Sequence, residues 1–479
     1  MDINDELKQA EELLELGNIS ESLQKILNYL SYSKPESKDL KNIYSDYKAG
    51  CLLIDIGDLN RNHELINKGI SIIDSQRYDN FISKISRDYN LGNGKKALFD
   101  AKRKQEHGKY SSELLKIAIQ AKNYYIRCLN SDEDISAEFK YQILVNAANA
   151  LDVCGRPTEA LFFYNQALTI NPKRFEAHAS KSTALKWLND LSGLHTEQMM
   201  LVTKYHLQKA LKYAPSYSNI DELKRRLELL ELSLSKINED LINYNEKHRL
   251  KYKFSYQNSR KDYLINNSLY LSHHSCYCSC IDARTDDILG NYFIPNRKGL
   301  NRKVTLLRLL RRIITEYIFA RDLLFKNLNP KSNNLNSEES LRASYRICYG
   351  TLDKIARLIV LSEIGEFKNN ENLIFESFWR NKPKLKEKAM TSESYNLFAL
   401  YSIATDLELK EGELRFFKEW RNAFEHSLIV LTNSENKNIN QERIITISKS
   451  KLLENLPKLL RVIRSAIFST IFLLKEEKD

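Results

Sequence analysis

The chain has little glycine and proline, with 14 Gly and 8 Pro among 479 residues. This leaves little material for the turns of an all-β fold or for the phosphate-binding loops of a Rossmann fold. Walker, Rossmann and zinc-protease motifs are also missing. The sequence therefore predicts a mainly α-helical protein.

Long apolar runs are missing as well. No stretch of about 18 uncharged apolar residues occurs, and the N-terminal MDINDELKQAEELLEL is acidic and helix-like. The seven cysteines, at positions 51, 128, 154, 276, 278, 280 and 348, are odd in number, and most stand singly among apolar residues. We expect reduced thiols in a cytoplasmic protein that is neither secreted nor membrane-spanning.

Charge is what the chain has in excess. Lys and Arg number 73 against 62 Asp and Glu, a formal net charge of +11. This excess favours acidic partners such as RNA, although an ordinary lysine-rich surface explains it equally well. The length indicates two or three domains, each able to bury its own core.

Small residues recur at fixed offsets in two segments far apart in the chain. The first set is Ala10, Gly17 and Ser22, and the second is Ala148, Gly155 and Ala160, followed by Tyr164, Ala167 and Pro172. Small residues at these places let antiparallel helices approach closely, and the glycine ends the first helix. The second segment resembles a tetratricopeptide repeat, with every feature in its expected order.

Two segments between these, 47–73 and 85–104, are interpreted as degenerate helix–turn–helix units. A long-helical pattern over 198–250 follows, which caps the array. We predict a tetratricopeptide-like array over 1–235, whose usual role is to hold a peptide or protein. A connecting region over 236–300 precedes a helical bundle over 301–479.

Strong amphipathic periodicity predicts the helices of this bundle. They cover 304–325, 337–364, 394–407, 413–428 and 457–474. Two short apolar runs, 427–432 and 443–448, are separated by polar residues and predict an inserted β-hairpin.

The segment RNAFEH, residues 421–426, carries the candidate chemistry. On its helix the core-facing stripe is Phe417, Trp420, Phe424 and Leu428. Asn422 and His426, one turn apart, are expected to face the opposite side, which makes His426 accessible. Arg421 and Glu425 form another such pair on the flank, where Glu425 supports the arginine.

These groups suit RNA cleavage without a metal. The imidazole of His426 can take the proton of a ribose 2′-hydroxyl or give one to the leaving 5′-oxygen. The guanidinium of Arg421 can hold the phosphate as negative charge develops. One histidine serves only one of the two proton transfers, so a site shared by two protomers is expected, in a homodimer formed through the bundle.

RNAFEH is similar to the R-polar-x-x-x-H motif of the HEPN superfamily (higher eukaryotes and prokaryotes nucleotide-binding), and the resemblance covers about 300–479. Repeats before such a domain look like a bacterial branch found among conflict, toxin-type and phage-defence proteins. The resemblance implies a dimeric endoribonuclease with Arg421 and His426 catalytic and Asn422 their polar neighbour. The Gly-Ser and paired aspartates of the nucleotidyltransferases that accompany many HEPN domains are missing here.

A polar residue on a facing helix is common in this superfamily, and Asp353 is the candidate; a local ion pair with Arg357 explains it equally well. Two basic stripes are candidates for guiding RNA through phosphate contacts, with a solvated bundle surface as the alternative for each. The stripes are Arg308, Arg311 and Arg312, and Lys458, Arg461 and Arg464.

The segment from His273 to Cys280 has the residue types of a zinc site, with His274, Cys276 and Cys278 between them. Its spacing lacks paired CxxC elements and at period two fits one side of a strand. We therefore expect no metal and no cofactor.

A rival reading is a non-catalytic adaptor, in which the repeats hold a protein and the bundle only dimerises. The enzyme hypothesis predicts that RNA is cleaved, and the adaptor hypothesis predicts that it is not. In the enzyme reading, the N-terminal array is a sensor or inhibitor-binding module that restrains a toxic ribonuclease.

Overall fold

The computed structural model describes residues 3–33, 39–106, 110–194, 196–215, 220–235, 260–288, 300–328, 335–364, 373–391, 394–426, 428–432 and 444–476. Within these ranges the chain is mainly helical, as predicted, and no helix has the length and apolar character needed to cross a bilayer.

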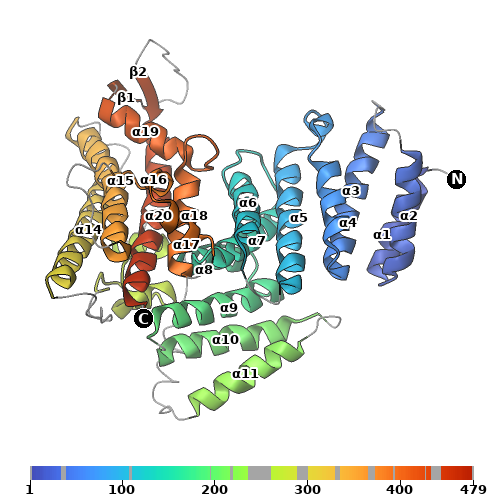
Figure 1. Ribbon diagram of the computed structural model, residues 1–479, viewed down its shortest axis with the longest axis horizontal. Coiled ribbons are helices and arrows are strands. Elements are labelled where there is room, and N and C mark those ends of the chain that lie inside the picture. The colour runs from blue at the N-terminus through green and yellow to red at the C-terminus, as the bar shows by residue number, and fades with distance from the viewer. Residues whose placement is uncertain are drawn as a thin grey trace. The chain divides into compact units, whose positions relative to one another are not determined.

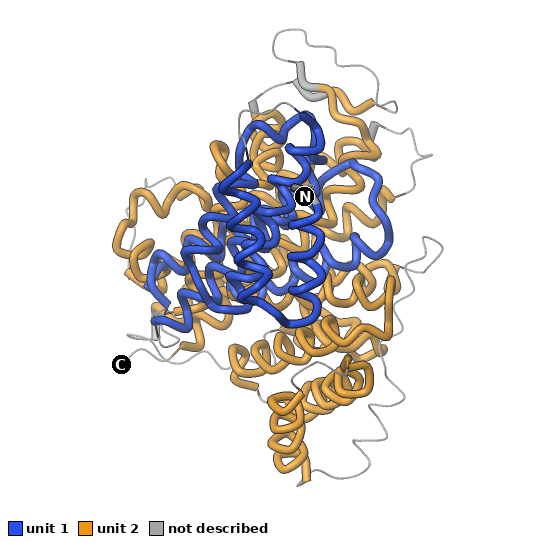
Figure 2. Tube along the Cα trace, turned by 90° about the vertical axis from the view of Figure 1, so that its right-hand side faces the viewer, with its two compact units in different colours: residues 1–154, 390–392 blue, residues 155–389, 393–479 orange. Residues whose placement is uncertain are grey.

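Two compact units make up the chain, coloured separately in Figure 2. The first holds residues 1–154 and 390–392, and the second holds 155–389 and 393–479. The predicted boundaries at 235/236 and 300/301 each adjoin a stretch outside the described residues. The three-part division therefore stays a prediction.

The first unit is a succession of antiparallel helices (Figure 1). They are α1 (Ile3–Glu15), α2 (Ile19–Tyr32), α3 (Leu40–Asn60), α4 (His63–Ile73), the short 3-10 helix η1 (Gln76–Tyr78), α5 (Lys84–Gln105), α6 (Ser112–Leu129) and α7 (Ala137–Val153). Each α-helix packs on the next along the chain, with the most extensive contacts in the pairs α1/α2, α3/α4 and α5/α6. This is the arrangement of a helical-hairpin array.

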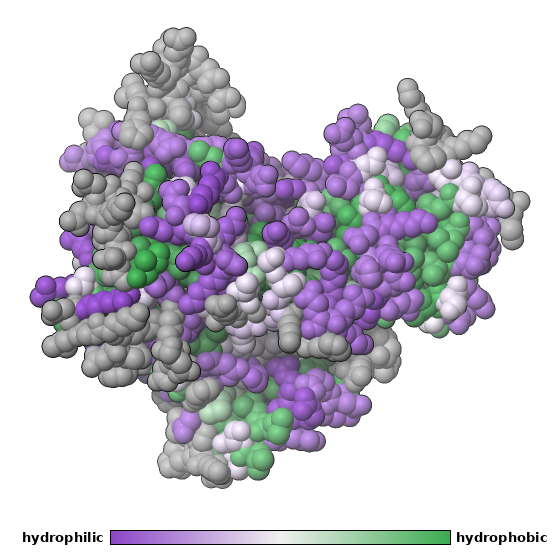
Figure 3. All heavy atoms as spheres, viewed as in Figure 1, coloured by the Kyte–Doolittle hydropathy of each residue, from purple (hydrophilic) through white to green (hydrophobic). Residues whose placement is uncertain are grey.

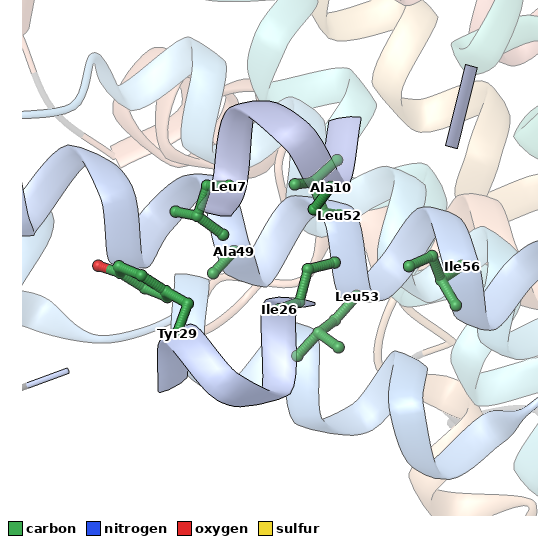
Figure 4. Packing of buried hydrophobic residues seen from close by; sticks show 8 residues of the cluster. All are labelled: Leu7, Ala10, Ile26, Tyr29, Ala49, Leu52, Leu53 and Ile56. Atoms are coloured by element: carbon green, nitrogen blue, oxygen red, sulfur yellow. The ribbon is translucent and has the colours of Figure 1, made fainter. Parts of the chain in front are cut away.

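The small residues of the first predicted repeat lie where two helices meet. Ala10 and Ser22 are fully buried, and the Ser22 hydroxyl donates to the Ala10 carbonyl at 2.6 Å. Gly17 between the helices has a φ of +82°, a conformation that side chains rarely adopt. Ala10 belongs to a core in which α1, α2 and α3 interlock (Figure 4), so this hairpin is confirmed.

The two degenerate units fare differently. Residues 47–73 form a helix–turn–helix, parts of α3 and α4. Residues 85–104 were predicted to turn but form the single helix α5, so that prediction is wrong. A Cβ on Gly92 would lie 2.8 Å from the Tyr125 ring, and one on Gly94 would lie 2.7 Å from the Ile70 side chain. These glycines allow close helix packing and do not end the helix.

The second unit contains the remaining helices and both described strands. The first of them are α8 (Pro157–Ile170), α9 (Phe175–Ser192), α10 (Glu197–Tyr213), α11 (Asp221–Leu234), α13 (Arg260–Asn266), and the 3-10 helices η2 (His273–Cys276) and η3 (Ile281–Ala283). The rest are α14 (Leu300–Lys326), α15 (Leu335–Glu363), α16 (Phe378–Asn381), α17 (Pro383–Ala389), α18 (Tyr395–Leu407), α19 (Arg415–His426), β1 (Leu428–Thr432), β2 (Ile444–Ser448) and α20 (Lys449–Lys475). The five predicted bundle helices are confirmed as α14, α15, α18, α19 and α20.

Helix α20 is the centre of the bundle. It packs against α14, α15, α18 and α8. From Leu459 to Leu474 every side chain except Arg461 is buried. A helix surrounded in this way carries apolar residues on nearly all sides.

The two predicted strands form, but they do not make a hairpin. β1 and β2 pair in parallel, with Leu428 opposite Ile444 and Thr432 opposite Ser448. A hairpin joins antiparallel strands, whereas parallel strands need a crossover connection. The β-hairpin prediction was therefore wrong in strand direction.

A buried ion cluster joins the start of α8 to α18 within the second unit. Arg156, with 1% of its side chain exposed, contacts the carboxylates of Glu159 and Asp406, with its Nε 2.8 Å from Glu159 Oε1. The guanidinium donates to both, so each charge has a partner of opposite sign. This cluster fixes the repeat-like helix α8 against the bundle.

We expect Asp406→Asn to lower the free energy of unfolding of the second unit by about 1.5–3 kcal/mol, because it replaces a charge-assisted hydrogen bond of the buried Arg156 guanidinium with a neutral one. Denaturant unfolding at neutral pH measures this loss. The matched control is Glu454→Gln, which breaks the exposed pair with Lys458 and should cost at most about 1 kcal/mol. Equal losses for the two variants would contradict a structural role for the cluster.

Candidate functional site

Helix α19 is held on α15 by aromatic packing. The Tyr345 ring lies 6.4, 6.0 and 5.1 Å from the rings of Phe417, Trp420 and Phe424, and its hydroxyl donates to the Phe417 carbonyl at 2.5 Å. These three residues are the predicted stripe. The fourth, Leu428, begins β1, and its side chain lies outside the described residues.

Arg421 lies at the edge of this aromatic contact. Its guanidinium carbon is 5.8 Å from the centre of the Tyr349 ring, and its Nη2 is 3.7 Å from Oδ2 of Asp353. Its Nη1 donates to Oδ1 of the adjacent Asn422 at 3.3 Å. The Arg421 side chain is 23% exposed, so the charge is steadied from α15 and still reaches solvent.

Asp353 faces Arg421 from α15, as the resemblance led us to expect. Its Oδ1 accepts the Phe375 backbone N–H at 3.0 Å. Burial raises the pKa of the Asp353 carboxyl to about 6, and the Glu376 carboxylate adds to this, against the opposing effects of the Phe375 N–H, Arg421 and Lys354. Among the described residues no ion pair joins Asp353 to Arg357, the alternative considered from the sequence.

A second charged pair lies beneath the first. The Lys418 ammonium of α19 pairs with the buried Glu376 carboxylate. Tyr349 is fully buried next to both carboxylates, and burial, followed by Glu376 and Asp353, raises its pKa. Sequence reasoning missed Glu376 and Lys418. The position of Lys418, one turn before Arg421 on α19, was the available signal.

The other motif residues are described to different extents. Asn422 is half-buried and Glu425 is exposed. In the part of the chain that the structure describes, Arg421 makes no ion pair with Glu425, whose supporting role stays a prediction. His426 is the last residue of α19, one turn after Asn422, and its side chain lies outside the described residues.

The first basic stripe lies on the surface of α14. Arg308, Arg311 and Arg312 are exposed, and Arg312 pairs with Glu316 at 2.6 Å. This exposure is compatible with phosphate contacts.

The second stripe is only partly on the surface. Lys458 is half-buried and pairs with Glu454 at 2.9 Å, and the Arg461 guanidinium carbon lies 4.1 Å from the centre of the Phe162 ring. Arg464 is 2% exposed, with its donors directed at Tyr270 O, Ser275 Oγ and Cys276 Sγ. Naming Arg464 as an RNA contact was wrong, because α20 is buried on the side from which it projects.

Three members of the His/Cys cluster come together. One ligand atom each of His274, Cys278 and Cys280 lies within 4.8 Å of the others, while His273 is buried and Cys276 contacts Arg464. The segment contains η2 and η3, not the strand whose spacing argued against a metal.

Comparison with protein families matches residues 298–477 to the family described as LA2681-like HEPN. No match was found among curated proteins. The family match confirms the expected HEPN resemblance of the C-terminal part and indicates a ribonuclease-type or nucleotide-related function.

The raised pKa of Asp353 predicts a pH-dependent cost. Its folded value of about 6 exceeds the unfolded value of about 3.9, so wild-type stability falls as pH rises through this interval and stays lower above it. Asp353→Asn keeps an acceptor for the Phe375 N–H without the charge.

We expect the stability of Asp353→Asn relative to wild type to increase between about pH 4 and pH 6, by up to about 2–3 kcal/mol, and then to level off. Urea midpoints measured from pH 4 to pH 8 give this difference. A difference that is constant across the range would show that the carboxyl titrates normally.

Proposed function

We propose that the C-terminal bundle is a metal-independent endoribonuclease of the HEPN type, in which Arg421 and His426 act on the RNA phosphodiester and Asn422 is their polar neighbour. The observation that carries the proposal is the placement of Arg421. Its guanidinium is directed by Tyr349 and Asp353 yet remains 23% exposed, inside the R-N-A-F-E-H motif at the end of α19.

The chemistry needs two proton transfers and one charged clamp. The ribose 2′-oxygen attacks phosphorus as its proton leaves, the bond to the 5′-oxygen breaks, and that oxygen gains a proton. The products are a 2′,3′-cyclic phosphate and a 5′-hydroxyl end. His426 performs one proton transfer, and Arg421 stabilises the charge on the non-bridging oxygens.

Asp353 acts as a positioning residue. Its carboxyl lies 3.7 Å from Arg421 Nη2, longer than a direct charge-assisted hydrogen bond, and burial disfavours its ionised form. The Asp353 carboxyl therefore orients the Arg421 guanidinium and leaves some of its N–H donors available. An RNA phosphate, with a full negative charge, then competes for the same donors.

Exposed arginines on α14 would extend the RNA contact. Arg308, Arg311 and Arg312 offer phosphate contacts. Lys458 and Arg461 of α20 are half-buried and would add weaker contacts. Such contacts bind without reading sequence and weaken with salt.

A bacterial defence or toxin-type role follows from the proposed activity combined with the repeat array. Leu16, Tyr32 and Leu59 of the first unit are each more than half exposed, and Figure 3 shows apolar patches among its helices. Apolar patches of this kind mark protein-binding surfaces. We propose that the array receives a protein signal or inhibitor that controls cleavage.

We expect purified wild-type protein to cut RNA in the presence of EDTA and to leave 2′,3′-cyclic phosphate ends. Arg421→Ala and His426→Ala should each lower the rate at least about 100-fold with folding retained, because each removes a group acting in the transition state. Sequencing of RNA ends and circular dichroism measure the two effects.

The matched controls are Arg415→Ala, an exposed arginine on the same helix, and His63→Ala, a histidine of the first unit; both should cleave like wild type. The adaptor reading predicts that no RNA is lost and that effects on bacterial growth survive both motif substitutions. That outcome would replace the enzyme proposal.

A site shared by two protomers predicts complementation. Mixing Arg421→Ala with His426→Ala protein, with subunit exchange allowed, should restore part of the activity, because a mixed dimer combines the Arg421 of one chain with the His426 of the other and leaves only the second proton transfer to solvent. The rate is measured against each variant alone, and light scattering gives the oligomeric state. Dimers that exchange but stay inactive would place both groups of a site in one chain.

A further inference from the structure

Most of residues 267–278 are buried, although the segment from 267 to 288 contains only two short 3-10 helices. Leu269, Leu271 and Ala283 have no exposed surface. Side chains of neighbouring helices use its carbonyls: Tyr317 of α14 donates to Leu269 O at 2.9 Å, and Arg464 of α20 donates to Tyr270 O at 2.7 Å. An irregular segment of this kind gains little from its own backbone ladder, so other links must hold its shape.

Turn chemistry places three metal-ligand side chains on one side of this segment. The Ser272 hydroxyl accepts the Ser275 N–H at 3.1 Å and begins η2, and the Cys278 N–H then reaches back to the His274 carbonyl at 3.0 Å. The Cys280 N–H donates to Cys278 Sγ at 3.3 Å. Hydrogen bonds of this kind help to orient the ligands of metal sites.

The distances fit tetrahedral coordination. His274 Nε2 lies 3.6 Å from Cys280 Sγ. A zinc ion with a Zn–N bond of about 2.0–2.1 Å and a Zn–S bond of about 2.3 Å separates such ligand atoms by roughly 3.6 Å. One ligand atom from each of the three residues lies within 4.8 Å of the other two, so only small side-chain movements would bring all three to bonding distance.

We propose that His274, Cys278 and Cys280 bind one zinc ion, with a fourth coordination position left for water or another ligand. Two thiolates and an imidazole are soft and borderline donors that suit zinc rather than Mg²⁺ or Ca²⁺. Binding forms two Zn–S bonds and one Zn–N bond and releases the two thiol protons to solvent. Cys278 is buried, while His274 and Cys280 are partly exposed and leave the ion a route of entry.

The zinc ion stabilises the turn that contains η2 and η3. It takes no part in RNA cleavage. Next to the ligands, the Tyr277 hydroxyl contacts Gln198 Oε1 of α10 at 3.3 Å, and Cys276 Sγ contacts the Arg464 guanidinium of α20 at 3.1 Å. Fixing the turn between these residues therefore braces α10 and α20 of the same unit. The ligands lie outside the cluster of Arg421, Tyr349 and Asp353, so chelation is not expected to remove a catalytic group.

The test is the metal content of the full chain, produced without a polyhistidine tag in zinc-sufficient medium and purified under reducing conditions without chelator. We expect about one zinc per chain in wild type and less than about 0.2 in His274→Ala, Cys278→Ser and Cys280→Ser. Cys51→Ser and His63→Ala, which alter a thiol and an imidazole of the first unit, should keep the full amount. Circular dichroism identifies any variant that fails to fold, and Cys280→Asp provides a second ligand-changing variant for the partly exposed position.

Cobalt substitution tests the donor set. Co²⁺ in the apo protein should give thiolate-to-cobalt charge-transfer absorption that both cysteine variants weaken. Wild type without zinc and without this absorption, zinc retained by all three ligand variants, or a Cys278–Cys280 disulfide in protein kept under reducing conditions would each overturn the proposal. None of these measurements involves RNA, so their outcome is independent of the nuclease assay.

Discussion

The packing of α19 on α15 is the contact on which the candidate site depends. Tyr345, Tyr349 and Asp353 are spaced four apart and therefore share one face of α15. The first holds the aromatic face of α19, the second lies under the Arg421 guanidinium, and the third pairs with it. One periodic face thus joins an apolar contact to a polar one, and the apolar contact sets the position of the arginine.

The polar half of this interface contains two ion pairs with different roles. Lys418 neutralises Glu376 in the buried layer, where an unpaired carboxylate would be costly. In the outer layer the Asp353 carboxylate faces the Arg421 guanidinium at a distance of 3.7 Å. Burial raises the pKa of the Asp353 carboxyl to about 6. The inner pair therefore secures the helix contact, while the outer pair leaves guanidinium donors available to an incoming phosphate.

Sequence reasoning succeeded where short-range periodicity decides the structure. The bundle helices were predictable because each carries an apolar face over several turns, and the first hairpin because Gly17 marks a turn between small residues. The packing of Phe417, Trp420 and Phe424 followed from helix geometry alone. Asp353 was suggested by family resemblance, since the residue facing a helix from another element leaves no local signal.

Contacts between distant segments explain what the sequence did not reveal. Arg464 belongs to a helix that other helices cover on several sides. The spacing of Lys458, Arg461 and Arg464 resembles a basic surface stripe, but Arg464 is buried. The composition of the two apolar runs fits either strand direction and so did not reveal the parallel pairing of β1 with β2. His274, Cys278 and Cys280 fit no standard zinc spacing, yet a 3-10 turn brings them together because it folds the chain back over a few residues. The sequence spacing of metal ligands is therefore a weak guide wherever the backbone between them is neither helix nor strand, and there the packing partners of the turn decide the geometry.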